Sequence, residues 1–256
     1  MNLFQKFKQL HEAPSPLMLA NIWDVNSAKI FEASGYQAIG ISSAAISNAF
    51  GYDDGENIPF DLVLQITKNV TKAVTIPLTV DMEGGYSRNV NDIIANIEKL
   101  HDAGAVGINL EDTVADGVRK FLPAGEYKKT LSTITDHLSR RNINMFLNVR
   151  TDGFLSGLQN ALEETIGRIN SYADTGINGI FVPCITKVDD IKEVVSTTTL
   201  PVNVMCMPNF PNFETLQSLG VKRISMGPFF FNKVYEHAGH LAKTIISDNN
   251  FSSITN

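Results

Sequence analysis

Short apolar runs recur along the whole chain, and longer segments between them carry apolar residues every three or four positions. The runs are rich in β-branched residues and apolar on both faces, which is typical of strands buried in a parallel sheet, whereas the longer period predicts amphipathic helices. Residues 90–103 are an example, with four apolar side chains on one helical face: Ile93, Ile94, Ile97 and Leu100. The pattern predicts eight strands, at residues 17–23, 38–43, 77–83, 107–112, 145–150, 179–184, 201–206 and 223–227.

A glycine stands four residues before an isoleucine at four places, each time after a helical segment: Gly35/Ile39, Gly104/Ile108, Gly176/Ile180 and Gly220/Ile224. This spacing indicates a helix that ends at a positive φ and turns into a buried strand. Eight strand–helix units in 256 residues predict a closed (β/α)₈ TIM barrel, with residues 1–256 as one domain. We expect the N-terminal segment and the C-terminal tail to be loosely ordered. An open doubly wound sheet is the alternative, disfavoured because no glycine-rich phosphate loop follows a strand.

Composition excludes several classes of function. The chain has 21 basic and 27 acidic side chains and a formal net charge of −6, and its basic residues are scattered, which argues against a nucleic-acid or anionic-membrane surface. No apolar run approaches the length of a membrane span, and the first 16 residues lack the apolar core of a signal peptide. A cytoplasmic enzyme with two reduced cysteines, Cys184 and Cys206, is the expectation.

Polar residues gather where the predicted strands end, which in a barrel is where the chemistry lies. Asp81 and Glu83 are two positions apart on one strand, so both carboxylates are expected on the same face, with Glu111 at matching height on the next. Like charges packed together need a counter-ion, and hard oxygen ligands without histidine favour Mg²⁺ or Mn²⁺. The sequence therefore predicts a metal site at Asp81, Glu83 and Glu111.

Arg150 is a basic residue at the end of a predicted core strand, where its guanidinium can clamp a substrate carboxylate. Asp24 and Asp112 remain open between a site role and a capping or ion-pair role. No lysine lies inside a predicted strand, which weakens a Schiff-base mechanism, and no Ser/His/Asp set supports acyl transfer. Metal-assisted enolate chemistry on a 2-oxo acid remains.

An ordered set of motifs between about residues 16 and 235 resembles the isocitrate lyase/phosphoenolpyruvate mutase superfamily. The motifs are Asn21-Ile-Trp-Asp24, Ser42-Ser43 with Gly51-Tyr-Asp-Asp54-Gly-Glu56, Asp81-Met-Glu83-Gly-Gly-Tyr86, Gly107-Ile-Asn-Leu-Glu111-Asp112, Arg150-Thr-Asp152, Phe181-Val-Pro183 and Arg223-Ile-Ser225-Met-Gly227. The resemblance implies a TIM barrel, Mg²⁺-dependent chemistry on 2-oxo or 2-hydroxy acids, and a homo-oligomer, a dimer or a tetramer, in which the last helix can be exchanged between subunits.

The resemblance also implies roles for individual residues. Asp81 and Glu83 match the metal-site acids, and Glu111 and Asp54 act at or near the ion, so the candidate catalytic residues are Arg150, Asp54 and Glu111. Arg150 matches the arginine that binds the substrate carboxylate. The candidate substrate-binding residues at the strand ends are Trp23, Ser42, Ser43, Arg150 and Asn203.

The segment after Glu111 departs from the better-known branches. It reads Glu111-Asp-Thr-Val-Ala-Asp-Gly-Val-Arg-Lys120 and lacks both the K-[KR]-C-G-H motif of the lyases and the K-x-N-S motif of the mutases. The remaining branch resembles oxaloacetate decarboxylases, so we expect C–C cleavage of a small 2-oxo dicarboxylate, with residues 113–125 as a lid. A phosphonate-forming or phosphonate-cleaving enzyme and a non-catalytic metabolite-binding barrel are the alternatives, and a role for Cys184 is undecided.

Overall fold

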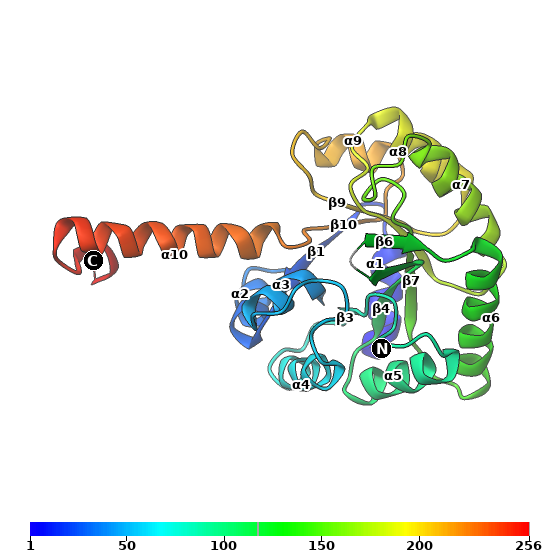
Figure 1. Ribbon diagram of the computed structural model, residues 1–256, viewed down its shortest axis with the longest axis horizontal. Coiled ribbons are helices and arrows are strands. Elements are labelled where there is room, and N and C mark those ends of the chain that lie inside the picture. The colour runs from blue at the N-terminus through cyan, green and yellow to red at the C-terminus, as the bar shows by residue number, and fades with distance from the viewer. Residues whose placement is uncertain (117, 256) are drawn as a thin grey trace.

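Eight parallel strands close into a barrel in the computed structural model, which describes residues 1–116 and 118–255 (Figure 1). The strands follow one another around the barrel in the order β1-β10-β9-β8-β7-β4-β3-β2. Each lies within the range that its hydrophobic pattern predicts, so the predicted fold class is confirmed. Their bounds are β1 Leu17–Ile22, β2 Ile39–Ile41, β3 Leu78–Asp81, β4 Gly107–Glu111, β7 Phe146–Arg150, β8 Gly179–Val182, β9 Val202–Met205 and β10 Arg223–Ser225.

Helices connect the strands and bury their apolar stripes against the outside of the barrel, as amphipathic helices do. The predicted helix at residues 90–103 is α5, and its four predicted apolar residues are all buried. The connecting helices are α2 Val25–Ala33, α3 Ser43–Ala49, α4 Phe60–Thr71, α5 Val90–Asp102, α6 Ala124–Arg140, α7 Ala161–Tyr172, α8 Val188–Thr197 and α9 Phe213–Ser218.

The N-terminal segment is not loosely ordered, contrary to expectation. It forms helix α1 (Leu3–Glu12), in which the side chain of Asn2 caps the Gln5 amide. Phe7 is fully buried in a cluster with the residues that begin the barrel strands, and the His11 ring stacks on Phe146 with 4.3 Å between centroids. The burial of this apolar face holds α1 against the N-terminal end of the barrel, opposite the strand ends that carry the polar residues.

Two segments leave the regular barrel pattern. The expected lid at 113–125 contains an antiparallel hairpin, β5 (Thr113–Asp116) and β6 (Val118–Phe121), before α6 begins at Ala124. After β10 the chain continues into α10 (Phe229–Asp248), which points away from the barrel and ends beside the short helix α11 (Ser252–Thr255) (Figure 1). No helix in the described ranges is both long enough and apolar enough to cross a bilayer.

Candidate active site

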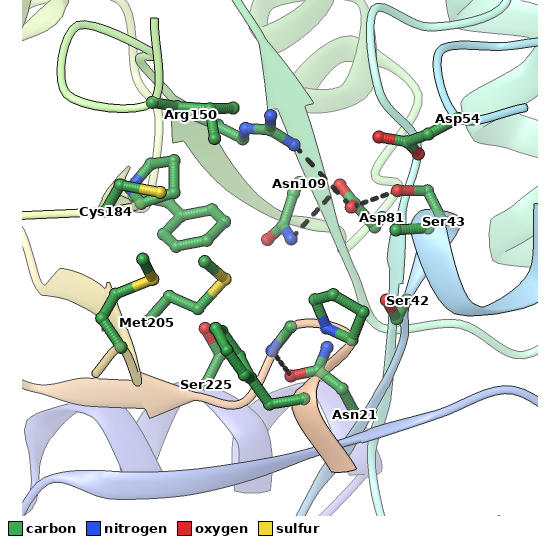
Figure 2. Close-up of a pocket in the computed structure, with 18 of the residues that line it drawn as sticks. Asn21, Ser42, Ser43, Asp54, Asp81, Asn109, Arg150, Cys184, Met205 and Ser225 are labelled. Atoms are coloured by element: carbon green, nitrogen blue, oxygen red, sulfur yellow. Dashed lines mark hydrogen bonds and ion pairs between the residues drawn. The ribbon is translucent and has the colours of Figure 1, made fainter. Parts of the chain in front are cut away.

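A cavity of about 560 Å³ opens at the C-terminal ends of the barrel strands, where the sequence predicts the chemistry. Neighbouring strands contribute polar side chains to it, and the hairpin contributes Arg119 from above. Figure 2 shows the labelled side chains, among them Ser43, Asp81, Asn109 and Arg150, converging on one space. The polar and charged lining residues are Asn21, Ser42, Ser43, Asp54, Asp81, Asn109, Arg119, Arg150, Ser156 and Ser225.

Asp81 is the carboxylate that ends β3 and lines this cavity. Its Oδ2 accepts a hydrogen bond from the Ser43 hydroxyl at 2.7 Å, and its Oδ1 lies 3.5 Å from the amide nitrogen of Asn109 (Figure 2). The guanidinium of Arg150 is 3.9 Å away. Asp81 therefore reaches the cavity from a position fixed on both sides by donors.

Arg150 ends β7 and is held by two carboxylates. Its Nε and Nη2 donate to Asp152 at 2.6 and 3.0 Å, and its Nη1 lies 2.9 Å from Oε2 of Glu111. The register explains the second contact, because Glu111 on β4 is directly paired with Arg150 on β7. Although burial opposes its charge, Glu111 and Asp152 raise the pKa of Arg150 well above its usual value, so the guanidinium is permanently charged.

An amide layer below the cavity orients Asn109. The Oδ1 of Asn109 accepts hydrogen bonds from Asn148 at 2.9 Å and from Arg223 at 3.3 Å. Asn148 lies on the neighbouring strand β7 and Arg223 on β10 across the barrel, and both are buried. Because the oxygen of Asn109 is occupied from below, its NH₂ group is the end that faces Asp81.

Glu83 does not share a face with Asp81, contrary to expectation. Strand β3 ends at Asp81, and Glu83 has a φ of +50°, so the alternation of an extended strand no longer applies. Glu83 is not among the residues that line the cavity, and its carboxylate accepts the Glu56 amide at 2.8 Å and lies 3.3 Å from the Tyr86 hydroxyl. Burial and the nearby acids, Asp54 first among them, raise the pKa of Glu83 to about 8.

Glu111 likewise faces arginines rather than open space. It pairs with Arg150 and with Nη1 of Arg119, and burial raises its pKa to about 7 although both arginines oppose this. Asp54 lies 3.4 Å from Nη2 of Arg119, and burial and Asp81 raise its pKa. Within residues 1–116 and 118–255, no group of three His, Cys, Asp or Glu side chains is arranged to hold a metal ion. Of the three residues predicted to bind the metal, Asp81 lines the cavity, Glu111 pairs with the two arginines, and Glu83 is absent from the cavity lining.

Ser42 lies between β2 and α3, Ser43 is the first residue of α3, and both line the cavity. The Ser42 hydroxyl caps α3 by accepting the Ala45 amide at 3.3 Å, while Ser43 bonds to Asp81. Nearby, the Asn21 oxygen accepts the amides of Met226 and Gly227 at 2.7 and 3.0 Å, which fixes the turn after β10.

Two of the predicted substrate-binding residues lie outside the cavity lining. Trp23 packs edge to face on Phe231 with 5.2 Å between ring centroids, so its aromatic surface is used in packing under α10. Asn203 is buried one layer lower, and its amide donates to the Ser225 hydroxyl at 3.3 Å. Asn203 can therefore act on the cavity only through Ser225.

The structure bears on the three residues whose roles the sequence leaves undecided, Asp24, Asp112 and Cys184. Asp24 caps α2 by accepting the Ser27 amide at 2.7 Å, and buried Asp112 pairs with Arg168 at 3.1 Å. Cys184 lines the cavity, but burial raises the pKa of its thiol, which disfavours the reactive thiolate.

Sequence reasoning did not assign Arg119, Asn109 or Asn21 to the site. Asn21 and Asn109 lie near the ends of predicted strands, where functional side chains of a barrel are expected, so the sequence does contain a signal for them. Arg119 had no such signal, because its place depends on how the hairpin folds over the barrel.

Comparison with known proteins gives the family. The phosphoenolpyruvate phosphomutase family model matches residues 7–246, so the chain belongs to the phosphoenolpyruvate mutase/isocitrate lyase superfamily and is an enzyme of its lyase and mutase type. An uncharacterized protein of Mycobacterium tuberculosis, Rv1998c, is 30% identical over 243 residues, which cover 93% of this chain and 88% of the relative.

Two further similarities bear on fold and chemistry. A crystal structure of a phosphonomutase-like protein from Burkholderia cenocepacia is 31% identical, with a TM-score of 0.89 over 94% of this chain and 99% of the other. An oxaloacetate decarboxylase of a Bradyrhizobium species is 27% identical over 193 residues, 71% of this chain and 63% of that protein.

Proposed function

We propose that this protein is a Mg²⁺-dependent lyase that decarboxylates a small 2-oxo dicarboxylic acid, with oxaloacetate as the first candidate. The observation that carries the proposal is the pair formed by Asp81 and Arg150, 3.9 Å apart in one cavity. An acid that can hold a cation and a fixed guanidinium that can bind a carboxylate are the two groups that a 2-oxo acid requires. The similarity to an oxaloacetate decarboxylase supports this choice of substrate.

The donor set fits a divalent cation. Four carboxylates contact two guanidiniums at this end of the barrel, namely Asp54, Asp81, Glu111 and Asp152 around Arg119 and Arg150. Burial and the neighbouring acids raise the pKa of Glu83, and burial raises that of Glu111, so a cation bound here would stabilise their charged forms. Asp81, with Asp54, would hold Mg²⁺ or Mn²⁺, while Glu83 and Glu111 are close enough to act through water. The ion would withdraw electrons from the 2-oxo group.

The protein's own residues position the substrate and exclude water. Arg150, fixed by Asp152, binds a carboxylate, and the hydroxyls of Ser42 and Ser43 lie at the other side of Asp81. The hairpin would limit the access of water to the reacting carbon while the C–C bond breaks, and solvent would reach the enolate afterwards. In decarboxylation the C3–C4 bond breaks, C4 leaves as CO₂ and its electron pair forms the enolate of pyruvate, which takes a proton from solvent. The reaction therefore needs no cysteine proton donor, in agreement with the departure from the lyase motif.

Turnover of oxaloacetate tests this proposal. We expect purified protein with Mg²⁺ to convert oxaloacetate into pyruvate and CO₂ faster than Mg²⁺ alone, as followed by NMR. Asp81→Ala and Arg150→Ala should each abolish turnover while circular dichroism stays unchanged. Retained activity in both variants would refute the assignment, and turnover of phosphonopyruvate in place of oxaloacetate would favour phosphonate chemistry.

A further inference from the structure

The hairpin that covers the cavity rests on the loop that carries Asp54. A side-chain carbon built on Gly55 would lie only 2.6 Å from Cβ of Ala115 in β5, so the two segments touch because residue 55 has no side chain. Gly55 also has a φ of +100°, which glycine adopts readily. The contact between Arg119 and Asp54 joins the same two segments. The hairpin thus contacts the Asp54 loop, and Arg119 lines the cavity.

The two cavity arginines differ in how firmly they are held. Arg150 extends from a barrel strand, its side chain is 8% exposed, and all three of its nitrogens contact Asp152 or Glu111. Arg119 extends from β6 and is 19% exposed. Its Nη1 contacts Glu111 and Asp152, but among the described residues its Nη2 contacts only Asp54, at 3.4 Å, and that carboxylate is 45% exposed. Nη2 of Arg119 is therefore the more available donor at this end of the cavity.

The rest of the cavity offers no other cation. Among its described lining residues, Arg119 and Arg150 are the two basic side chains, and the opposite wall consists of apolar and sulfur-containing groups such as Phe181, Met205 and Phe229. A carboxylate that entered this wall unpaired would lose its hydration without compensation. If Arg150 binds one carboxylate of a substrate, Arg119 is the other cation among the described lining residues that can pair with a second one.

The spacing of the two guanidiniums suits a short diacid. Both contact the same carboxylate, because Arg119 pairs with Oε1 of Glu111 and Arg150 with Oε2. They consequently lie side by side along one wall, within reach of the two ends of a three- or four-carbon chain. A second guanidinium also gives discrimination, since a buried group built to pair with a carboxylate is left unpaired by a ligand that lacks one.

We propose that Arg119 is the specificity-determining residue of this site, binding the second carboxylate of the substrate and selecting 2-oxo dicarboxylic over 2-oxo monocarboxylic acids. The inference rests on the proposed function, because it assumes that Arg150 binds the first carboxylate. It gives a role to the segment that replaces the lyase and mutase motifs.

Calorimetry with two ligands of matched length tests the inference. With Mg²⁺ present, malate supplies the second carboxylate but has no 2-oxo group to accept electrons and so cannot be decarboxylated, 2-hydroxybutanoate lacks the second carboxylate, and oxalate reports on the metal and Arg150 end of the site. We expect Arg119→Gln to weaken malate binding at least tenfold while oxalate and 2-hydroxybutanoate change less than twofold. Arg119→Lys should restore part of the loss, because it keeps the charge but not the planar fork.

The control is Lys120→Gln, which removes a neighbouring charge on the exposed side of the same strand and should bind all three ligands as the unaltered protein does. Equal weakening of all three ligands in Arg119→Gln, or unchanged binding of the dicarboxylate, would overturn the role proposed for Arg119. It would leave the proposed function of the protein standing. Failure of the unaltered protein to bind oxalate with Mg²⁺ would overturn the proposed function and the inference with it.

Discussion

Arg150 and Asp152 form a two-point pair, with Nε and Nη2 of the arginine donating to the two oxygens of the aspartate at 2.6 and 3.0 Å. Asp152 is fully buried and also accepts the Thr113 hydroxyl at 2.8 Å and Nη1 of Arg119 at 3.2 Å. This one carboxylate therefore connects the fixed guanidinium of the barrel to the hairpin above it.

Replacement of Asp152 should remove the connection between Arg150 and the hairpin. Asp152→Asn leaves one acceptor oxygen at residue 152 where Arg150 had two, so we expect kcat/KM to fall about 100-fold through misplacement of the guanidinium. The free energy of unfolding should fall by about 3 kcal/mol, because a buried charge loses its partner. Steady-state kinetics and urea unfolding measure the two effects. Asp174→Asn, which removes an exposed pair with Lys128, is the control and should change neither. A variant at Asp152 with unaltered kinetics would show that this pair is not needed for activity.

Gly55 should control closure of the hairpin. Gly55→Ala adds a carbon 2.6 Å from Ala115 at a strained backbone angle, so the hairpin cannot reach its present position. We expect kcat/KM to fall at least tenfold, with about 1–3 kcal/mol lost from the free energy of unfolding. Gly125→Ala is the matched control, because nothing lies within 4 Å of the added carbon and alanine suits the first turn of α6. Similar kinetics for both glycine variants would contradict the closing role.

The barrel and its polar strand ends could be predicted because both depend on local pattern. Strands buried on both faces are largely apolar, and Asp81, Glu111 and Arg150 mark where the apolar run of each strand ends. The orientation of Glu83 could not be predicted, since it depends on a positive φ just beyond the strand. The place of Arg119 could not be predicted either, because the hairpin that carries it packs against the loop of Asp54, 65 residues earlier in the chain.

Two local signals were present but unused. Asn2 and Gln5 form a capping box that begins α1, and the pair Asp116-Gly117 between two short alternating runs is a hairpin signal in the sequence. The first signal predicts an ordered N-terminal helix, and the second predicts a hairpin in the lid.

His11 should make stability depend on pH. Burial, and the charge of Arg223, lower its pKa from 6.5 to about 3, so the folded state keeps the ring neutral. Between these values the unfolded chain binds the proton and the folded chain does not. The free energy of unfolding should therefore fall as pH drops below about 6.5, by up to about 1.4 kcal/mol per pH unit from this residue.

The contribution of His11 is isolated by comparison with a variant. His11→Phe keeps the stacking on Phe146 but cannot take up a proton, so urea unfolding between pH 7 and pH 4 should show a shallower decline than in the unaltered protein. His237→Gln, at an exposed position on α10, should leave the slope unchanged. An identical slope in His11→Phe would contradict the neutral buried ring.

Helix α10 should bind a second copy of the chain. It projects from the barrel (Figure 1). Four apolar residues recur at helical spacing along it: Val234, Ala238, Leu241 and Ile245. Tyr235 and Ile246 are also exposed, at 53% and 82%. An apolar helix face of this length is costly in water, so light scattering at micromolar concentration should give a dimer or a tetramer. Val234→Asp with Ile245→Asp should reduce the mass, whereas Lys243→Gln should not. A monomeric unaltered protein would contradict the prediction.

Calorimetric titration of oxalate, a planar mimic of the enolate of pyruvate, tests the central claim most directly. The account predicts binding that requires Mg²⁺ and is lost in Asp81→Asn, because Asp81 is the carboxylate placed to hold the ion beside Arg150. Lys243→Gln, far along α10, should bind as the unaltered protein does. Oxalate binding that is equal with and without Mg²⁺, or absent in both, would contradict the metal-dependent site.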